Sequence, residues 1–230
     1  MLLRFIGTFS VCSGCICFGC SCTGGIDLQS RTTTWQGGGS PFGIGAKPLG
    51  MWLFVVSDAL TFSTLLVCYT YLRLSSPAWP APFHTTSILY GTVMTLVLLT
   101  SSLTMAMAVE RMKHGERRAA VRYLLLTILC GAAFLVIHLS EWRQLMQIEK
   151  ITFTSNPWNE PLFGAAFFGL TGLHMLHVAA GIVYLAVIVV GTGRGKFTLA
   201  DIETSGIYWH FVDLVWMFLF PLLYLVSVKL

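Results

Sequence analysis

The sequence predicts an all-α membrane protein in which five transmembrane helices form a bundle. Of its 230 residues, 55% are hydrophobic and only 10% are charged, whereas an ordinary soluble domain carries about 25% charged residues. So few charges cannot cover the surface of a soluble enzyme of this size. The apolar content also excludes a disordered chain. The 14 Lys and Arg residues are scattered, so they form no basic patch for nucleic acid.

The apolar residues gather into five stretches, each near the ~20 residues that cross the hydrocarbon core. We expect helices, because backbone polar groups inside a bilayer must be satisfied within their own segment, whereas a membrane barrel would show short alternating segments. The predicted helices cover residues 49–72, 88–109, 123–139, 162–190 and 208–228. Between them lie a proline-rich loop (75–82), a charged hairpin (110–118), a segment that ends in a proline suited to a helix start (156–161) and a glycine-rich basic turn (191–196).

The distribution of basic residues predicts the orientation, because cytoplasmic loops carry an excess of Lys and Arg. With a cytoplasmic N-terminus, the inner side holds Arg4, Arg31, Lys47, Arg111, Lys113, Arg117, Arg118, Arg122, Arg194 and Lys196. The outer, periplasmic side, which includes the C-terminus, then holds only Arg73, Arg143, Lys150 and Lys229. The inverted arrangement would reverse this bias.

In this orientation, aromatic residues fall near both membrane surfaces, where Trp and Tyr commonly form belts. The expected inner belt comprises Trp52, Tyr123, Tyr208 and Trp209. The expected outer belt comprises Tyr69, Tyr71, Trp79, Trp142, Trp158 and Tyr224.

Residues 1–46 form a separate cysteine-rich leader before the transmembrane domain at 47–230. Five of the seven cysteines lie here: Cys12, Cys15, Cys17, Cys20 and Cys22. We expect an irregular or interfacial segment. A thiolate metal site, a lipidated leader and a short spanning helix are the alternatives, although a cleaved or lipidated leader would reverse the predicted orientation.

Polar residues at membrane depth are costly and are therefore candidate functional residues. Asp58 lies in the first predicted helix, and Glu141 follows the third. The fourth helix carries His174 and His177, and the fifth carries the pair His210 and Asp213, each pair three residues apart. Three interpretations remain open: a zinc or non-haem iron site, a proton relay through Asp58, and structural hydrogen bonds between helices or to lipid headgroups.

Two longer motifs resemble subunit III of the haem–copper oxidases. Residues 167–178 (FFGLTGLHMLHV), followed by Gly181, are similar to the signature of that family's fourth helix, and residues 208–216 (YWHFVDLVW) to that of its last helix. Weaker support comes from residues 53–58 (LFVVSD), 101–104 (SSLT) and 139–142 (LSEW). The resemblance covers about residues 47–230 and is nearer to cytochrome c oxidases than to quinol oxidases. It points to the short five-helix bacterial form, in a multi-pass chain of the inner membrane.

The resemblance implies a non-catalytic subunit of cytochrome c oxidase that holds no redox centre, metal or cofactor of its own. Haem and copper belong to its partners, subunits I and II. Its expected roles in aerobic respiration are packing on subunit I, holding phospholipid, supporting proton uptake and protecting the enzyme during turnover, within a respiratory supercomplex or outside one. The proton-related residues would be Asp58, Glu141, His174, His177, His210 and Asp213, and the lipid-headgroup residues Arg122, Trp209 and His210.

Four features depart from the family pattern. The two extra N-terminal helices of seven-span members are absent, Asp58 replaces the usual Glu, Met175 replaces a Gly between the two histidines, and the cysteine-rich leader has no counterpart. Subunit III of a quinol oxidase or a nitric oxide reductase remains an alternative, as does a stand-alone metal-binding or proton-conducting membrane protein. We expect Asp58 to join the polar residues of the fourth and fifth helices in one hydrogen-bonded cluster, because a lone carboxylate in hydrocarbon is costly.

Overall fold

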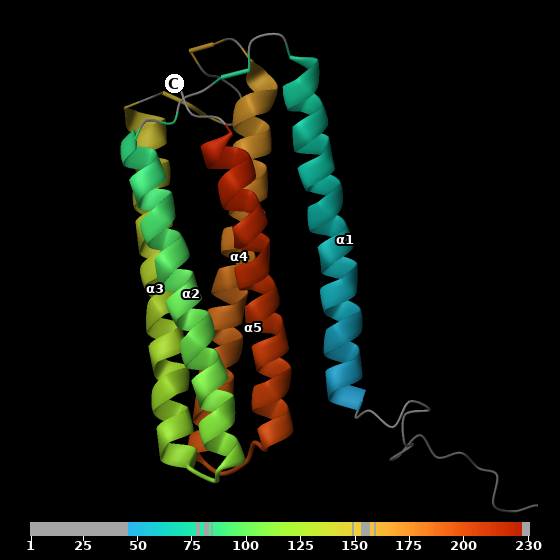
Figure 1. Cartoon of the computed structure of the whole chain (residues 1–230), viewed down its shortest axis with the longest axis vertical. Helices are drawn as coiled ribbons and strands as arrows, with labels where there is room; N and C mark the ends of the chain where they lie inside the picture. Colours follow the sequence, from blue (N-terminus) through green and yellow to red (C-terminus); the bar gives the residue numbers. More distant parts are fainter. Residues whose placement is uncertain are drawn as a thin grey trace, which may run out of the picture. The chain divides into compact units, whose positions relative to one another are not determined.

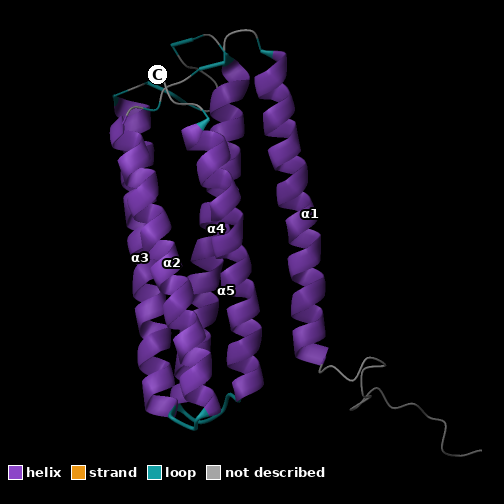
Figure 2. Cartoon of the chain, in the orientation of Figure 1, coloured by secondary structure: helices purple, strands orange, loops and turns teal. Residues whose placement is uncertain are grey.

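The computed structural model describes residues 46–76, 79–80, 83, 85–148, 150–152, 157–158 and 160–226, without the side chains of Thr85, Thr86 and Pro161. Its elements are all helical (Figure 2). The expectations for the leader lie outside the described residues, except that Ala46 already begins the first helix.

Five long helices confirm the predicted fold class, and each is long and apolar enough to cross a membrane. They are α1 (Ala46–Ser75), α2 (Thr85–Lys113), α3 (Arg117–Gln147), α4 (Pro161–Gly193) and α5 (Leu199–Phe220), and α5 continues as a π-helical turn, η1 (Pro221–Leu225). The first four contain the whole of their predicted apolar stretches. They are longer because a helix keeps its backbone hydrogen bonds beyond the ~30 Å hydrocarbon core.

The fifth helix begins nine residues earlier than the predicted start at 208. The added residues 199–207 include Asp201, Glu203, Thr204 and Ser205, so hydropathy alone does not reveal them. The start is determined by Asp201, whose Oδ2 accepts a hydrogen bond from the backbone N–H of Thr198 at 2.9 Å. The same carboxylate accepts one from Lys47 Nζ of α1 at 2.7 Å through Oδ1. The N-terminal end of α5 is thereby capped and joined to α1.

The charged hairpin between α2 and α3 is shorter than predicted, because both helices run into it. Gly115 closes the turn with φ +76°. Its N–H donates to Met112 O, and the N–H of Glu116 donates to Arg111 O. This is the Schellman arrangement, which needs a residue in the left-handed region and therefore favours glycine. Gly195 ends α4 in the same way, with φ +74°.

The helices α2 to α5 pack against one another, and α1 lies on the far side of α4 and α5 from α2 and α3 (Figure 1). Most of α5 is buried, whereas only three residues of α1 are: Val55, Phe62 and Tyr69. The core of the bundle is rich in aromatic side chains. Trp216 is completely buried, packs edge-on to Phe134 at 4.9 Å between ring centroids, and donates its indole N–H to Thr95 Oγ1.

The prediction of two aromatic belts is wrong for several members. Tyr69, Trp209 and Tyr224 are 1%, 1% and 0% exposed, so they pack inside the bundle. Trp142 packs on Phe168 at 5.0 Å. Trp52, Tyr71 and Trp158 are exposed, as a belt requires. Position along a helix is readable from sequence, but the direction in which the residue faces depends on which helices become neighbours.

The contact between α3 and α5 gives a stability prediction. A Cβ added at Gly131 would lie 2.6 Å from the ring of Trp209, which is buried and cannot move away easily. Gly131→Ala should lower the free energy of unfolding by about 1–3 kcal/mol, as overpacking does. The measurement is SDS-induced unfolding of the full-length chain in detergent micelles.

Gly169→Ala is the matched control, because a Cβ there meets no atom within 4 Å. It should be neutral or slightly stabilising, since Ala favours the helix over Gly. Equal loss of stability in both variants would contradict the close packing at Gly131.

Candidate functional site

Asp58 of α1 and His177 of α4 face each other within the membrane-spanning part of the bundle. Asp58 Oδ1 lies 3.3 Å from His177 Nε2, and the two side chains are only 12% and 14% exposed. His177 Nδ1 is 2.9 Å from the carbonyl oxygen of Leu173. A carbonyl can only accept, so Nδ1 carries a proton, and a neutral imidazole would then offer the carboxylate an unprotonated Nε2. A hydrogen bond between these two atoms would therefore use a proton on Nε2 or on the carboxyl.

The neighbours of this pair come from α1 and α5. The hydroxyl of Tyr208 donates to the carbonyl oxygen of His177 at 3.0 Å. The ring of Phe62 packs edge-on against the imidazole, with 5.3 Å between centroids. The Asp58–His177 pair thus lies at the junction of three helices and connects α1, which buries few residues, to the rest of the bundle.

Glu141 of α3 forms a separate contact with a residue near the C-terminal end of the chain. Its Oε2 accepts a hydrogen bond from the hydroxyl of Tyr224 at 2.8 Å, and both side chains are buried. Tyr224 belongs to η1, which begins at Pro221. Because proline has no N–H, it interrupts the regular helical ladder. The sequence analysis missed Tyr224 as a partner, because its hydroxyl had been expected at the membrane surface.

The pair on α5 contacts the hydroxyl groups of α2. His210 Nδ1 lies 2.7 Å from Ser102 Oγ, and Asp213 Oδ2 lies 3.5 Å from Ser101 Oγ. Ser101 Oγ also accepts the indole N–H of Trp209 at 3.1 Å. These contacts involve the hydroxyl groups of Ser101 and Ser102, and they join α2 to α5.

His174 has a different environment from His177, although the two are one helical turn apart. It is fully buried, stacks on Trp216 with 5.4 Å between centroids, and packs edge-on against Phe134. His138 of α3 is equally buried and contacts the same two rings. Both imidazoles therefore lie in an aromatic environment within the core.

The structure does not form the single polar cluster that we expected. Asp58 joins only His177, while Glu141, the pair His210 and Asp213, and His174 lie in separate contacts. Within the described residues, no three His, Cys, Asp or Glu side chains are grouped closely enough to hold a metal ion.

The three expected lipid-headgroup residues also separate. Arg122 is exposed near the beginning of α3. Trp209 is buried, and its indole N–H donates a hydrogen bond to Ser101 Oγ. His210 lies eleven residues into α5, which corresponds to about 16 Å of helix. For Trp209 and His210, the structure replaces the expected headgroup contacts with contacts inside the bundle.

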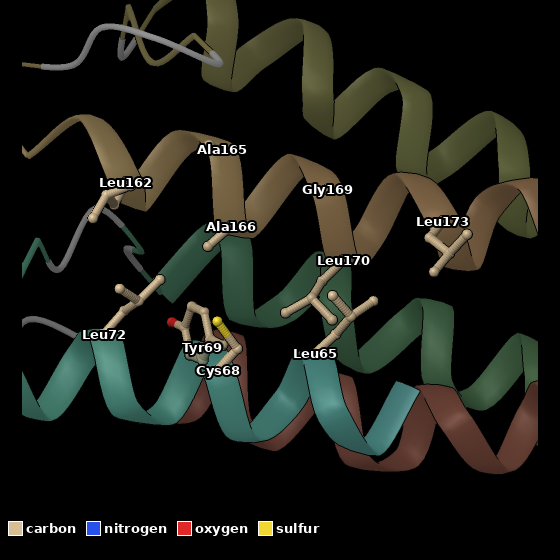
Figure 3. A pocket seen from close by; sticks show the side chains of 10 residues that line it. All are labelled: Leu65, Cys68, Tyr69, Leu72, Leu162, Ala165, Ala166, Gly169, Leu170 and Leu173. Atoms are coloured by element: carbon tan, nitrogen blue, oxygen red, sulfur yellow. The ribbon is translucent and has the colours of Figure 1, made fainter. Parts of the chain in front are cut away.

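An apolar groove of about 400 Å³ runs between α1 and α4 (Figure 3). Its walls alternate bulky side chains, such as Leu65 and Leu173, with small residues, such as Ala166 and Gly169. The side chains of α1 and those of α4 face each other across it (Figure 3).

These features define a multi-pass membrane protein in which several buried polar side chains meet between helices. Residues 26–228 match the family model for cytochrome c oxidase subunit III. The chain is 31% identical over 185 residues to cytochrome c oxidase subunit 3 of Alkalihalophilus pseudofirmus, covering 79% of this chain and 87% of the relative. It is also 31% identical to quinol oxidase subunit 3 of Bacillus subtilis, covering 78% and 86%. A heme–copper oxidase subunit I+III of Aeropyrum pernix is 28% identical over 76% of this chain and 22% of the relative.

The chain belongs to the cytochrome c oxidase subunit III family of the haem–copper oxidases. It is therefore a subunit of an oxidoreductase complex in the bacterial inner membrane and associates with other oxidase subunits. This membership replaces the alternative of a stand-alone membrane protein.

The Glu141–Tyr224 contact gives a second stability prediction. Tyr224→Phe keeps the ring but leaves the buried Glu141 without this donor, so the free energy of unfolding should fall by about 1–3 kcal/mol. Tyr71→Phe, at an exposed ring of α1, should change it little. SDS unfolding of the full-length chain compares the two, and equal effects would show that the hydrogen bond does not stabilise the bundle.

Proposed function

We propose that this chain is the non-catalytic subunit III of a cytochrome c oxidase and packs on the catalytic subunit I, while haem and copper are held by subunits I and II. The observation that carries the proposal is the Asp58–His177 contact, which joins α1 to α4 at membrane depth. Support for the partner comes from the Aeropyrum relative, whose name joins subunits I and III in one protein.

In this role, the Asp58–His177 pair supports proton uptake and keeps the catalytic subunit active during turnover. The contact between Asp58 and His177 orders the protein around it, because separating the two side chains would leave each polar group without this partner in hydrocarbon. The shorter Asp58 in place of Glu still reaches His177. Glu141, His174, His210 and Asp213 contribute by holding the surrounding helices together.

Bound phospholipid is part of the same proposal. The groove between α1 and α4 is apolar along its length and suits an acyl chain (Figure 3). Arg122 offers an exposed guanidinium at the inner end of α3, where anionic headgroups are attracted to basic residues. We assign headgroup binding to Arg122 alone of the three residues considered.

A quinol oxidase is the second candidate, favoured by a Bacillus subtilis relative that is as similar as the cytochrome c oxidase relative. Oxygen consumption by the purified complex separates the two. The first proposal expects activity with reduced cytochrome c, and activity with quinol alone would overturn it.

The orientation gives a testable topology with the N-terminus in the cytoplasm. Lys196, in the turn before α5, and Trp158, before α4, are both exposed and lie at opposite ends of α4. With native cysteines changed to serine, a membrane-impermeant maleimide should label Lys196→Cys in inside-out vesicles and Trp158→Cys in right-side-out vesicles. The reverse pattern would contradict the positive-inside assignment.

Substitution of Asp58 tests the functional proposal. In the purified oxidase complex, Asp58→Ala should leave the haem and copper spectra unchanged, yet the enzyme should lose activity after several-fold fewer turnovers. Asp58→Glu should retain most of the normal lifetime, because it preserves the carboxylate. The measurement is oxygen consumption followed until activity ceases.

Asp201→Asn is the matched control, because it weakens the Lys47–Asp201 contact of α1 without touching the Asp58–His177 contact. Its catalytic lifetime should stay near normal. An equal loss in Asp201→Asn would attribute the effect to detachment of α1, and a spectrum with missing haem or copper in Asp58→Ala would contradict the proposed role.

A further inference from the structure

A second groove lies between α1 and α5, toward the N-terminal ends of both helices. Its volume is about 330 Å³, within the range of sites that bind small organic molecules. The lining side chains are Trp52, Val55, Ile207, His210, Phe211 and Leu214. None of them carries a permanent charge. His210 is the lining residue whose ring can both donate and accept hydrogen bonds, and aromatic rings from both helices accompany it.

One nitrogen of His210 is already used inside the bundle. Nδ1 lies 2.7 Å from Ser102 Oγ of α2, whereas the ring lines the groove formed with α1. If the Ser102 hydroxyl donates to Nδ1, Nε2 carries the proton and can donate to a carbonyl oxygen. If Nδ1 donates to the hydroxyl, Nε2 can accept from a phenolic O–H. Each of the two imidazole tautomers, with the matching orientation of the Ser102 hydroxyl, therefore suits His210 to one of these partners.

The lining of the groove restricts the chemistry of a ligand. None of its side chains is a permanent cation, so a charged phosphate headgroup would find no ionic partner among them. A neutral ring with hydrogen-bonding oxygens needs no ionic partner.

The groove also continues along the same helix contact. A narrower groove of about 100 Å³ follows between α1 and α5 and shares Phe211 and Leu214 with the first. Its further lining residues include Ala59, Phe62 and Leu66. The wider part, with His210 at its wall, therefore leads into an apolar track suited to an unbranched or isoprenoid tail.

We propose that the α1–α5 groove binds an isoprenoid quinone or quinol, with one ring oxygen on His210 Nε2, the ring beside Trp52 and Phe211, and the tail along α1 and α5. The site concerns binding alone and involves no electron transfer by this chain. It goes beyond the function proposed above and does not depend on it.

Photolabelling of the purified oxidase complex in lipid nanodiscs tests the site. The probe is an azidoquinone with a short isoprenoid tail, and labelled peptides are identified by mass spectrometry. Label should appear on α1 around Trp52 or on α5 around His210, and excess unlabelled quinone should remove it. His210→Phe keeps a ring in place but removes the hydrogen bond, so labelling should fall about fivefold, the effect expected for one net hydrogen bond.

The chain contains its own control groove. A purely apolar groove of α4, lined by Ile182, Val183, Ala186, Val187 and Val190, has a comparable size. Equal labelling of both grooves would show mere partition of the probe into lipid and would overturn the proposal. So would displacement by excess phospholipid but not by quinone, or labelling found only on partner subunits.

Ser102→Ala provides a second variant that leaves His210 in place. It removes the hydroxyl that orients the imidazole, so labelling should fall less than in His210→Phe but measurably. If His210→Phe does not assemble, an unchanged label in Ser102→Ala would be the result that overturns the site.

Discussion

The arrangement of this bundle depends on contacts between polar side chains of different helices at membrane depth, where no water is available to solvate them. Asp58 of α1 meets His177 of α4, Glu141 of α3 meets Tyr224 of η1, and the hydroxyls of α2 meet the polar pair of α5. Each contact joins a different pair of elements. Interhelical contacts of this kind are individually modest in lipid, yet together they favour this set of neighbours, since separating these helices would leave the same polar groups in hydrocarbon without these partners.

The position of α1 shows the consequence most clearly. It buries few residues, and its polar contacts include Lys47 with Asp201 at one end, Asp58 with His177 farther along, and Arg73 with the carbonyl oxygen of Val226 at the other end. Apolar grooves lie on both sides of it, one against α4 (Figure 3) and one against α5. A helix held chiefly by polar and aromatic contacts leaves space for ligands along its sides. The same arrangement that brings Asp58 to His177 therefore leaves the two grooves on which the proposed lipid and ring-compound sites rest.

Much of the fold could be predicted from hydropathy, because the helices must cross an apolar layer of known thickness. The predicted start of the fifth helix was wrong, because polar residues extend α5 beyond its apolar stretch. The helix begins where Asp201 caps it. For the site, the sequence identified Asp58, His174 and His177 as candidates. It did not show that Asp58 contacts His177 and not His174. Two histidines three residues apart diverge by about 60° around a helix axis, so one faces α1 and the other the aromatic core. Tyr224 could not be identified as the partner of Glu141, because that contact depends on the turn that follows Pro221.

The sequence by itself determined the number of spans, the class of membrane protein and the family, since each rests on local composition or on motifs read along the chain. The tertiary structure alone decided which polar groups meet, which aromatic residues leave the membrane surface for the core, and where grooves remain. Those features depend on the rotation of each helix and on the choice of its neighbours. Both are set by all five helices packing together, which no single segment specifies.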